Sequence, residues 1–222
     1  MDDPALATER LQGALTGLTR LNFVSNSSRI VWRPIRQLAL ELKTNCLRVL
    51  DIATGSGDVP MALWRRAKRA GVSLEIQGID FSARSVEFAR EKGKRAGAAI
   101  TFECRNALTD DLPTNYDVVI CSLFLHHLTN DDAVNLLRRM AAAAKRLVLV
   151  NDLRRSTYGL TLAYVASRLL SRSEVVHVDA LRSVRAAFTP SELQDMASKA
   201  GLRDAVIGHR WPARMLLHWR RH

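Results

Sequence analysis

The stretch VLDIATGSGDVP, residues 49–60, runs from an apolar, strand-like segment through two glycines into a helical pattern. Gly55 and Gly57 can adopt positive φ angles and leave the backbone bare for the close approach of a ligand. The dinucleotide-binding form of this turn has a third glycine, which here is a proline. A pyrophosphate on the helix N-terminus would also lie close to Asp58 and not far from Asp51, and this repulsion is strongest where water is excluded. The turn therefore favours a cationic ligand over a phosphate.

Outward from this turn, short apolar runs alternate with amphipathic segments. The predicted strands cover residues 47–53, 73–79, 99–104, 117–123 and 146–151, and the predicted helices between them cover 59–70, 83–96 and 131–144. Strands rich in Val, Ile and Leu that alternate with helices indicate a parallel sheet covered on both faces. We therefore predict an open α/β fold whose ligands lie at the carboxyl ends of the strands.

The flanking segments complete the domain organisation. Asp3-Pro4 begins a helical pattern that continues to Leu21, and a second helix is predicted over 28–43, so residues 1–45 are expected to form an N-terminal helical cap. Residues 46–152 form the core, residues 153–188 a mostly helical insertion, and residues 189–222 a capped helix with two strand-like segments. Because we find no repeat and no long linker, we predict one domain over residues 1–222.

The charge of the chain predicts an attraction to anions. The sequence has 33 Lys and Arg against 22 Asp and Glu, a net charge of +11, which suits nucleic acid, an acidic lipid surface or a carboxylate-bearing substrate. The basic stretches at 64–70 and 89–97 fall in the C-terminal halves of two predicted helices, where cations meet the helix dipole favourably. A solvated helix face explains them more simply than a nucleic-acid footprint.

The cysteines and the N-terminus indicate the compartment. Cys46, Cys104 and Cys121 are far apart, and two lie within apolar strand-like runs, which suits reduced, buried thiols and neither a disulfide nor a zinc site. The N-terminus lacks a basic segment followed by an apolar one, and the longest apolar segment is too short to span a membrane. We therefore expect a cytoplasmic protein that has no transmembrane segment.

Asp80 identifies the ligand class more closely. It ends the second predicted strand, where a carboxylate can accept hydrogen bonds from both ribose hydroxyls of a nucleoside. Together with the glycine turn it predicts a positively charged nucleoside without phosphates. S-adenosylmethionine has these properties, because it combines an adenosine with a sulfonium and an α-ammonium group.

At these residues the sequence resembles the class I S-adenosylmethionine-dependent methyltransferases, chiefly over residues 46–152. The resemblance implies a Rossmann-like fold: a mostly parallel seven-stranded sheet with helices on both faces, an N-terminal helical cap and a helical insertion after strand five. It also implies S-adenosylmethionine as cofactor and S-adenosylhomocysteine as product. The cofactor-binding positions that it implies are Asp51, Ala53, Thr54, Gly55, Ser56, Gly57, Asp80, Phe81, Asn106, Ala107, Ser122 and Leu123.

The family pattern assigns these positions to parts of the cofactor. Residues 49–60 look like the motif that wraps the methionine part, and Phe81 would lie beside the adenine. Asn106 and Ala107 occupy the place of an Asp-Ala pair that faces the adenine amino group, and YDVVICSLFLHHL, residues 116–128, looks like the motif near the sulfonium. The sequence departs from the pattern at two places: Ala53 replaces a first glycine, and Asn106 replaces the commoner acid.

Two consecutive histidines are candidates for proton transfer. His126 and His127 follow the fourth core strand, so they should emerge at the ligand-bearing edge, where an imidazole with a pKa near 6.5 can accept a proton. Consecutive residues of a regular element do not face one pocket. We therefore expect His126 to be the base and His127 to lie toward the substrate, the alternative being that one of them only caps the turn or packs at the cofactor's edge.

The helical insertion supplies further candidates. His177 is a second candidate base, which Asp179 is expected to orient. Tyr158 and Tyr164 are expected to line a substrate cavity, and Arg154 is expected to attract an anionic acceptor. Each has a structural alternative: loop filling for the histidine, core packing for the tyrosines and a solvated helix start for the arginine.

The function that we predict is methyl transfer to a small, phenolic, aromatic or lipophilic acceptor, with transfer to oxygen favoured. The pair Asn151-Asp152 provides too few oxygen ligands for a magnesium site, so no metal is expected. The likeness to methyltransferases of quinone and polyketide-type biosynthesis makes carbon methylation a close rival. Two other hypotheses stay open: an RNA or DNA methyltransferase that uses the basic surface, although nucleic acid is the less favoured partner, and a cofactor-binding protein without catalytic activity.

Overall fold

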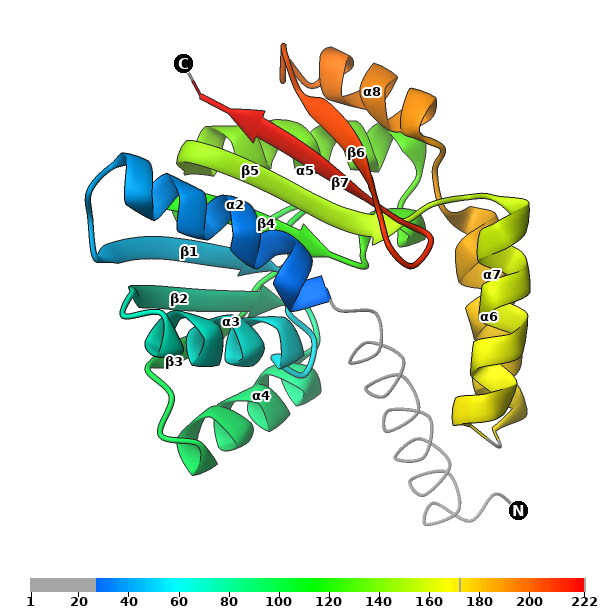
Figure 1. The fold of residues 1–222 in the computed structure, drawn as a ribbon, viewed down its shortest axis with the longest axis horizontal. Helices are drawn as coiled ribbons and strands as arrows, with labels where there is room; N and C mark the ends of the chain where they lie inside the picture. The colour runs from blue at the N-terminus through cyan, green and yellow to red at the C-terminus, as the bar shows by residue number, and fades with distance from the viewer. Residues whose placement is uncertain (1–26, 172, 222) are drawn as a thin grey trace.

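A computed structural model describes residues 27–171 and 173–221 of the chain (Figure 1). The helix predicted between Asp3 and Leu21 lies outside the described residues.

The centre of the fold is a seven-stranded sheet in the order β3-β2-β1-β4-β5-β7-β6. Its strands are β1 (Cys46–Ile52), β2 (Ser73–Asp80), β3 (Ile100–Cys104), β4 (Tyr116–Ser122), β5 (Ala144–Leu153), β6 (Val206–Arg210) and β7 (Arg214–Arg220). Strands β1 to β5 pair in parallel, whereas β7 pairs antiparallel with both β5 and β6. The predicted mostly parallel seven-stranded sheet with helices is confirmed.

Helices cover both faces of this sheet (Figure 1). The helices are α2 (Ser27–Glu41), α3 (Asp58–Arg69), α4 (Ala83–Arg95), α5 (Asn130–Ala143), α6 (Thr157–Leu170), α7 (Glu174–Ala186) and α8 (Pro190–Lys199). Apolar residues of α2 and α3 pack on one face, and those of α5 and α8 pack on the other. Helix α4 packs over β3 through Val86, Ala89 and Phe102.

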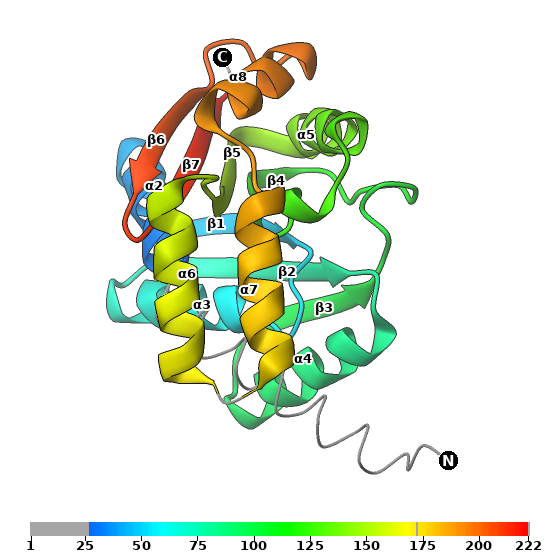
Figure 2. The same ribbon diagram turned by 90° about the vertical axis from the view of Figure 1, so that its right-hand side faces the viewer.

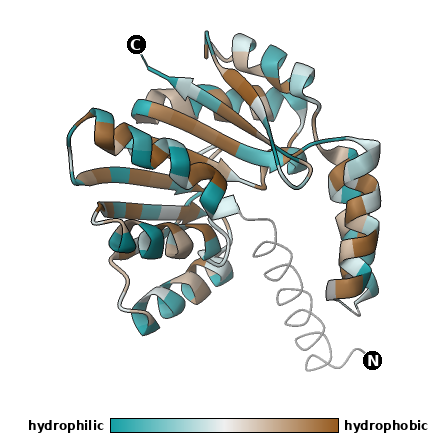
Figure 3. Ribbon diagram, viewed as in Figure 1, coloured by the Kyte–Doolittle hydropathy of each residue, from teal (hydrophilic) through white to brown (hydrophobic). Residues whose placement is uncertain are grey.

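The strands are apolar on both sides because both sides are covered. Val49, Leu50 and Ile52 of β1 are all fully buried, and successive residues belong alternately to the two core clusters. Figure 3 shows the result as predominantly brown strands between helices that alternate teal and brown. The predicted core strands and helices are all present, with ends within two residues of the predicted ones.

A helical hairpin, α6 and α7, stands at the carboxyl edge of the parallel strands (Figures 1 and 2). It corresponds to the insertion predicted to be mostly helical. Its two helices pack on each other, and α7 also contacts the short 3₁₀ turn η1 (Leu125–His127) that follows β4. The next helix, α8, begins with the capping box that Thr189 and Glu192 predict. The hairpin therefore closes one side of the edge where ligands of such folds bind.

The expectation of buried thiols is wrong for two of the three cysteines. Cys46 is the first residue of β1 and Cys104 the last residue of β3, so both lie at strand ends and are exposed, whereas Cys121 is buried within β4. All three are free. Within the described part of the chain, no helix combines the length and the apolar character that a membrane crossing requires.

Candidate active site

The turn between β1 and α3 uses its two glycines for different purposes. Gly57 has a φ of +74°, and a Cβ atom there would lie 2.9 Å from Cζ of Phe102. Gly55 has a φ of +53°, but a Cβ atom there would meet nothing within 4 Å. Gly57 is thus needed for the packing of α3 on the sheet, whereas Gly55 faces open space at the carboxyl edge.

Two non-glycine residues of this edge also have left-handed backbone. Ala53 follows β1 with a φ of 54°, and Leu123 follows β4 with a φ of 59°. Because β1 and β4 pair directly, the two residues leave neighbouring strands. Such conformations cost about 1–2 kcal/mol per residue and are retained where the surrounding structure imposes them, often at functional sites. Ala53 therefore has the conformation that favours the glycine it replaces.

Asp80 is buried at the end of β2, where backbone groups orient its carboxylate. Its Oδ2 accepts a hydrogen bond from the N–H of Gly55 at 2.8 Å, and its Oδ1 accepts one from the N–H of Ser82 at 2.9 Å. Since a carboxylate can accept about four hydrogen bonds, both oxygens keep a site for a ligand. The residue predicted to hold the ribose is thus fixed next to the glycine turn.

Asp51 lies beneath the same turn and is almost completely buried. Thr54 donates a hydrogen bond from its Oγ1 to Oδ2 of Asp51 at 2.7 Å. The pKa of Asp51 is raised to about 7, chiefly because the carboxyl group is buried. The hydrogen bond from Thr54 lowers this pKa, and the negative charge of Asp80 raises it further. A cation bound here would stabilise the ionised carboxylate.

Asp58 contributes less to this electrostatic preference than the sequence predicts. It accepts a hydrogen bond from Oγ of Ser56 at 2.8 Å and forms an ion pair with Lys92 of α4. Its charge is therefore compensated by a cation. Asp51 and Asp80 form no ion pair with any described residue, and so they account for most of the preference for a cation.

The positions predicted to face the adenine lie beside Asp80. The Phe81 side chain is 70% exposed directly after β2. Asn106, also exposed, uses its Oδ1 to accept a hydrogen bond from the N–H of Leu108 at 3.0 Å, whereas Ala107 is buried in the core. Phe81 thus offers an aromatic face, and the Asn106 oxygen keeps one acceptor site.

Unpaired polar atoms lie on the neighbouring strands β4 and β5. Oγ of Ser122 and both amide atoms of Asn151 are buried, and none has a hydrogen-bond partner among the described residues. The two residues are paired in the register of β4 with β5. Buried polar groups are rarely left unpaired in native proteins, so this spot near the carboxyl ends of β4 and β5 fits a polar ligand.

A cavity of about 260 Å³ lies between the strand ends and the α6–α7 hairpin. We call it the acceptor cavity. Its lining is mostly apolar, and it comes from η1, from both helices of the hairpin and from the β6–β7 turn. The lining residues are Leu123, His126, His127, Leu153, Gly159, Leu162, Ala163, Ala166, Val176, Asp179, Ala180, Ser183, Val184, Trp211, Pro212, Ala213 and Arg214.

Both predicted histidines line this cavity, so the argument that only one of them can do so is wrong. The rule of alternating faces applies to regular elements, and these residues lie in the short 3₁₀ turn η1. Their ring centroids are 4.1 Å apart. Partial burial, together with the neighbouring His126, lowers the pKa of His127.

His126 is held by an acid that the sequence analysis considered only as a metal ligand. Nδ1 of the buried His126 lies 2.6 Å from Oδ1 of Asp152, and the His126 backbone N–H donates to Oδ2 at 3.1 Å. The N–H of Leu153 also donates to Oδ1, at 2.6 Å. Because an ionised carboxylate only accepts, Nδ1 carries the proton and Nε2 is left as the basic nitrogen. The carboxyl ends of β4 and β5 thus build a His-Asp pair.

Four other predicted residues do not line the cavity. The ring of His177 is 2.8 Å from the carbonyl oxygen of Ser171, and Asp179, two residues further along the helix, faces the cavity in its place. Tyr158 and Tyr164 are about half exposed, and the Tyr164 ring stacks with Arg168. Nη1 of Arg154 donates a hydrogen bond to Nδ1 of His209 on β6 at 2.9 Å.

The residues that line the cavity instead of these four were not predicted from the sequence. The smaller α6 residues on the inner helix face, such as Leu162 and Ala166, line the cavity instead of the tyrosines. Asp152 was visible as an acid at the end of a strand, but nothing local links it to His126. Arg214 was not singled out at all. In the described residues, no three His, Cys, Asp or Glu side chains gather in a way that would hold a metal ion.

Comparisons with known proteins agree with this geometry. A family described as "Methyltransferase domain" matches residues 49–146. A ubiquinone biosynthesis O-methyltransferase from Bordetella parapertussis is 30% identical over 163 residues, which are 70% of this chain and 61% of the relative. A demethylmenaquinone methyltransferase from Thermus thermophilus is 32% identical over 121 residues, 54% of this chain and 53% of the relative. The chain thus spans about three fifths or less of the length of these curated relatives.

The fold comparison adds a cofactor-bound structure. Magnesium protoporphyrin IX methyltransferase from Synechocystis with bound S-adenosylhomocysteine has a TM-score of 0.61 at 19% identity, over 88% of this chain and 83% of that one. At that identity the likeness supports the fold alone. The family match spans the glycine turn and strands β1 to β4, and these findings show that residues 49–146 form a methyltransferase domain with the fold of the class I S-adenosylmethionine-dependent methyltransferases.

Proposed function

We propose that the protein transfers a methyl group from S-adenosylmethionine to an oxygen atom of a small aromatic or enolic acceptor. The observation that carries the proposal is the His126–Asp152 pair, whose histidine lines a mostly apolar cavity at the carboxyl edge of the sheet. Leu123 connects the two, because it follows the end of β4 and also lines the cavity.

The residues at the strand ends fit this cofactor. Asp80 has acceptor sites left for two ribose hydroxyls, Gly55 leaves open space above the turn, and Asp51 suits the α-ammonium group. Ser122 offers an unpaired hydroxyl on the adjoining strand. The bound cofactor supplies an electrophilic methyl group on a positively charged sulfur. The task of the protein is then to position the acceptor and to receive its proton.

His126 is the proposed proton acceptor. Asp152 holds Nδ1–H, so Nε2 is free to take the proton of an acceptor hydroxyl group. The methyl group that this oxygen gains would come from the sulfonium, whose bond to the methyl carbon breaks to leave S-adenosylhomocysteine. Ionising a phenol with a pKa of ~10 at pH 7 costs about 4 kcal/mol. Correct orientation of the two reactants is worth about 7–11 kcal/mol. The shape of the cavity therefore matters more than the base.

The names of the relatives support a quinone-type ring acceptor, and one of them specifies oxygen as the methylated atom. Their names describe an O-methyltransferase of ubiquinone biosynthesis and a methyltransferase of demethylmenaquinone. A mostly apolar cavity with few polar groups is typical of sites for small ring compounds. We favour oxygen because His126 provides a base beside the cavity, and carbon methylation of the same acceptor class is the rival.

The ribose role of Asp80 can be tested by calorimetry with S-adenosylhomocysteine. Asp80→Asn should weaken binding at least about tenfold, because a hydrogen bond to a charged group contributes about 1.5–3 kcal/mol. Glu75→Gln, an exposed acid of the same strand, should leave the affinity unchanged. Equal affinities for the wild type and the Asp80 variant would remove the ribose role, provided that both proteins unfold at the same temperature.

Cofactor binding should release a proton from Asp51. At pH 6 a carboxyl group with a pKa of about 7 is mostly protonated, and a bound ammonium group favours its ionised form. The affinity for S-adenosylhomocysteine should thus rise with pH up to about 7 and then level off. Calorimetry at pH 6 in two buffers of different ionisation enthalpy measures the release. Two controls should show no proton release: binding of methylthioadenosine, which lacks the ammonium group, to the wild type, and binding of S-adenosylhomocysteine to the Asp51→Asn variant.

The His126–Asp152 pair should affect turnover and not cofactor affinity. Replacing His126 by Ala or Asp152 by Asn should lower kcat by about 10²–10⁴, the usual contribution of a positioned base. His177→Ala is the matched control, because that ring lies outside the cavity, and its kcat should stay within about twofold. Transfer of labelled methyl groups to a panel of catechols and dihydroxybenzoates provides the assay. Full turnover without His126 would contradict the role, and no transfer to any acceptor would favour the non-catalytic hypothesis.

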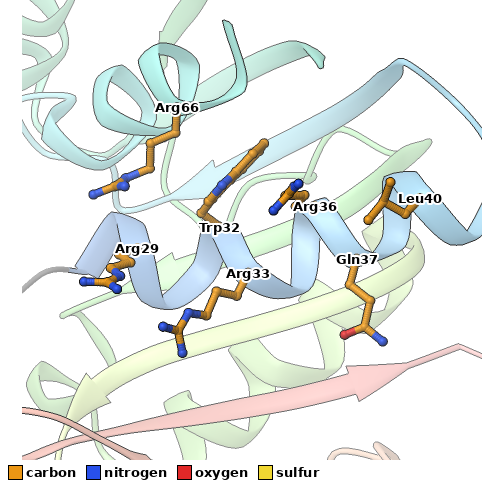
Figure 4. A pocket seen from close by; sticks show the side chains of 7 residues that line it. All are labelled: Arg29, Trp32, Arg33, Arg36, Gln37, Leu40 and Arg66. Carbon is orange, nitrogen blue, oxygen red and sulfur yellow. The ribbon is translucent and has the colours of Figure 1, made fainter. Parts of the chain in front are cut away.

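A second candidate function uses a basic surface on α2 (Figure 4). Arg29, Arg33 and Arg36 project from α2, with Arg66 of α3 beside them, around a hollow of about 340 Å³. Trp32, Gln37 and Leu40 complete its lining, and among the described residues no acid lines it. We call this the arginine surface. Its charge and its tryptophan suit a nucleic-acid backbone with stacked bases, the footprint expected of an RNA or DNA methyltransferase.

A charge reversal separates the two functions. The double substitution Arg33→Glu and Arg36→Glu should leave the affinity for S-adenosylhomocysteine and the turnover of a small acceptor unchanged, because both residues are exposed and outside the acceptor cavity. RNA retention measured across a salt titration should be weak for both proteins. Salt-dependent RNA methylation that the substitutions abolish would instead establish the second function.

A further inference from the structure

Arg214, the first residue of β7, has an unusual position for an arginine. It is 8% exposed and lines the acceptor cavity. Its cross-strand partner on β6, Arg210, is exposed. Its neighbour on β5 is Leu153, one residue beyond the acid that holds His126. The chain thus places a full positive charge in the wall of the cavity, close to the proposed base.

This buried charge has no partner within the protein. In the described chain, no acidic side chain forms an ion pair with Arg214, no hydrogen bond involves its guanidinium, and its Nη1 is buried without a partner. Asp152 acts on it electrostatically but already accepts three N–H groups. Burial lowers the pKa of Arg214 to about 10, and Asp152 opposes this shift. An arginine with that pKa is still charged at neutral pH.

A buried, unpaired guanidinium is costly for the fold, because charges are normally buried only with partners. Residues that cost stability in this way are retained where function needs them. Asp179 of α7 is the acid among the lining residues and acts electrostatically on His127, whereas the acid that acts on Arg214 is Asp152. The mostly apolar lining of the cavity therefore contains a cation from β7 and an acid from α7.

We propose that Arg214 binds an ionised oxygen of the acceptor, so that the enzyme selects aromatic or enolic acceptors that carry a carboxylate or an acidic phenolate or enolate group. This inference rests on the proposed function. A guanidinium fits a carboxylate with two parallel hydrogen bonds and stabilises a phenolate as a single charge. Arg214 would fix the orientation of the ring and so bring the methyl-accepting oxygen to Nε2 of His126. It is a specificity residue for the acceptor, and the cofactor residues do not depend on it.

The test compares anionic with neutral ligands on protein saturated with S-adenosylhomocysteine. One arm measures binding of 4-hydroxybenzoate against neutral 4-hydroxybenzamide by calorimetry. The other follows the ionisation of 4-nitrophenol by its absorbance, since a bound phenolate has a lowered pKa. The wild type should bind the anionic form at least about tenfold more tightly than the neutral form in one arm. A response in the first arm identifies a carboxylate as the bound group, and a response in the second identifies a phenolate.

Three variants distinguish this role from a structural one. Arg214→Met should abolish the anion preference and leave the melting temperature equal or higher, because it removes an unpaired buried charge. Arg214→Lys should keep part of the preference, and Arg210→Met, the exposed cross-strand neighbour, should keep all of it. A wild type without anion preference in either arm, or a preference that survives in Arg214→Met, would overturn the proposal.

A structural role gives a different pattern. If Arg214→Met unfolds or melts at a lower temperature while Arg214→Lys is stable but has no residual preference, the arginine serves the fold and the proposal fails. Binding of S-adenosylhomocysteine alone is measured first on the wild type and on Arg214→Met, and we expect equal affinities. If the wild type does not bind it, the proposed function fails by itself, and the anion measurements are then made on the free protein.

Discussion

The parallel pairing of β1 with β4 is the constraint on which the whole site depends. The strand order runs outward from this pair in both directions, so the connections after β1 and β4 leave the sheet on opposite sides and open a crevice between them. Asp51 and the glycine turn come from one strand, and Ser122, Leu123 and η1 come from the other. Without this junction the cofactor edge and the acceptor cavity would not adjoin.

The buried charges divide the site into two electrostatic environments. On the side of β1 and β2, Asp51 and Asp80 make the crevice attractive to a cation, and burial already holds Asp51 near half ionisation at neutral pH. On the side of β5 and β7, Arg214 and the His126–Asp152 pair make a region that suits an anion or an ionising hydroxyl group. These two environments would suit a positively charged donor on one side of the junction and an acceptor that becomes negative on the other.

Local sequence patterns predicted the framework well and the acceptor side less well. Apolar strands, the capping box at Thr189 and the two glycines are local signals, so the order of the elements and the place of Asp80 follow from them. The pairing of His126 with Asp152 joins residues 26 positions apart, and it exists only because β4 and β5 end side by side. The prediction that Tyr158 and Tyr164 of α6 line the cavity was wrong for a related reason. The packing of α6 on α7 decides which face of α6 is turned toward the cavity, and the tyrosines lie on the exposed face. The charge of Asp58 was misjudged because Lys92 reaches it from another helix.

The α6–α7 hairpin has a consequence for how the acceptor cavity can vary. It is one continuous segment that supplies a large share of the acceptor cavity, whereas the predicted cofactor residues lie outside it on the preceding strands. Substitutions within this hairpin would alter the lining of the cavity and leave the predicted cofactor residues unchanged. The two large core clusters of the sheet contain no residue of α6 or α7, so changes on the inner face of the hairpin would reshape the cavity without disturbing the packing of those clusters.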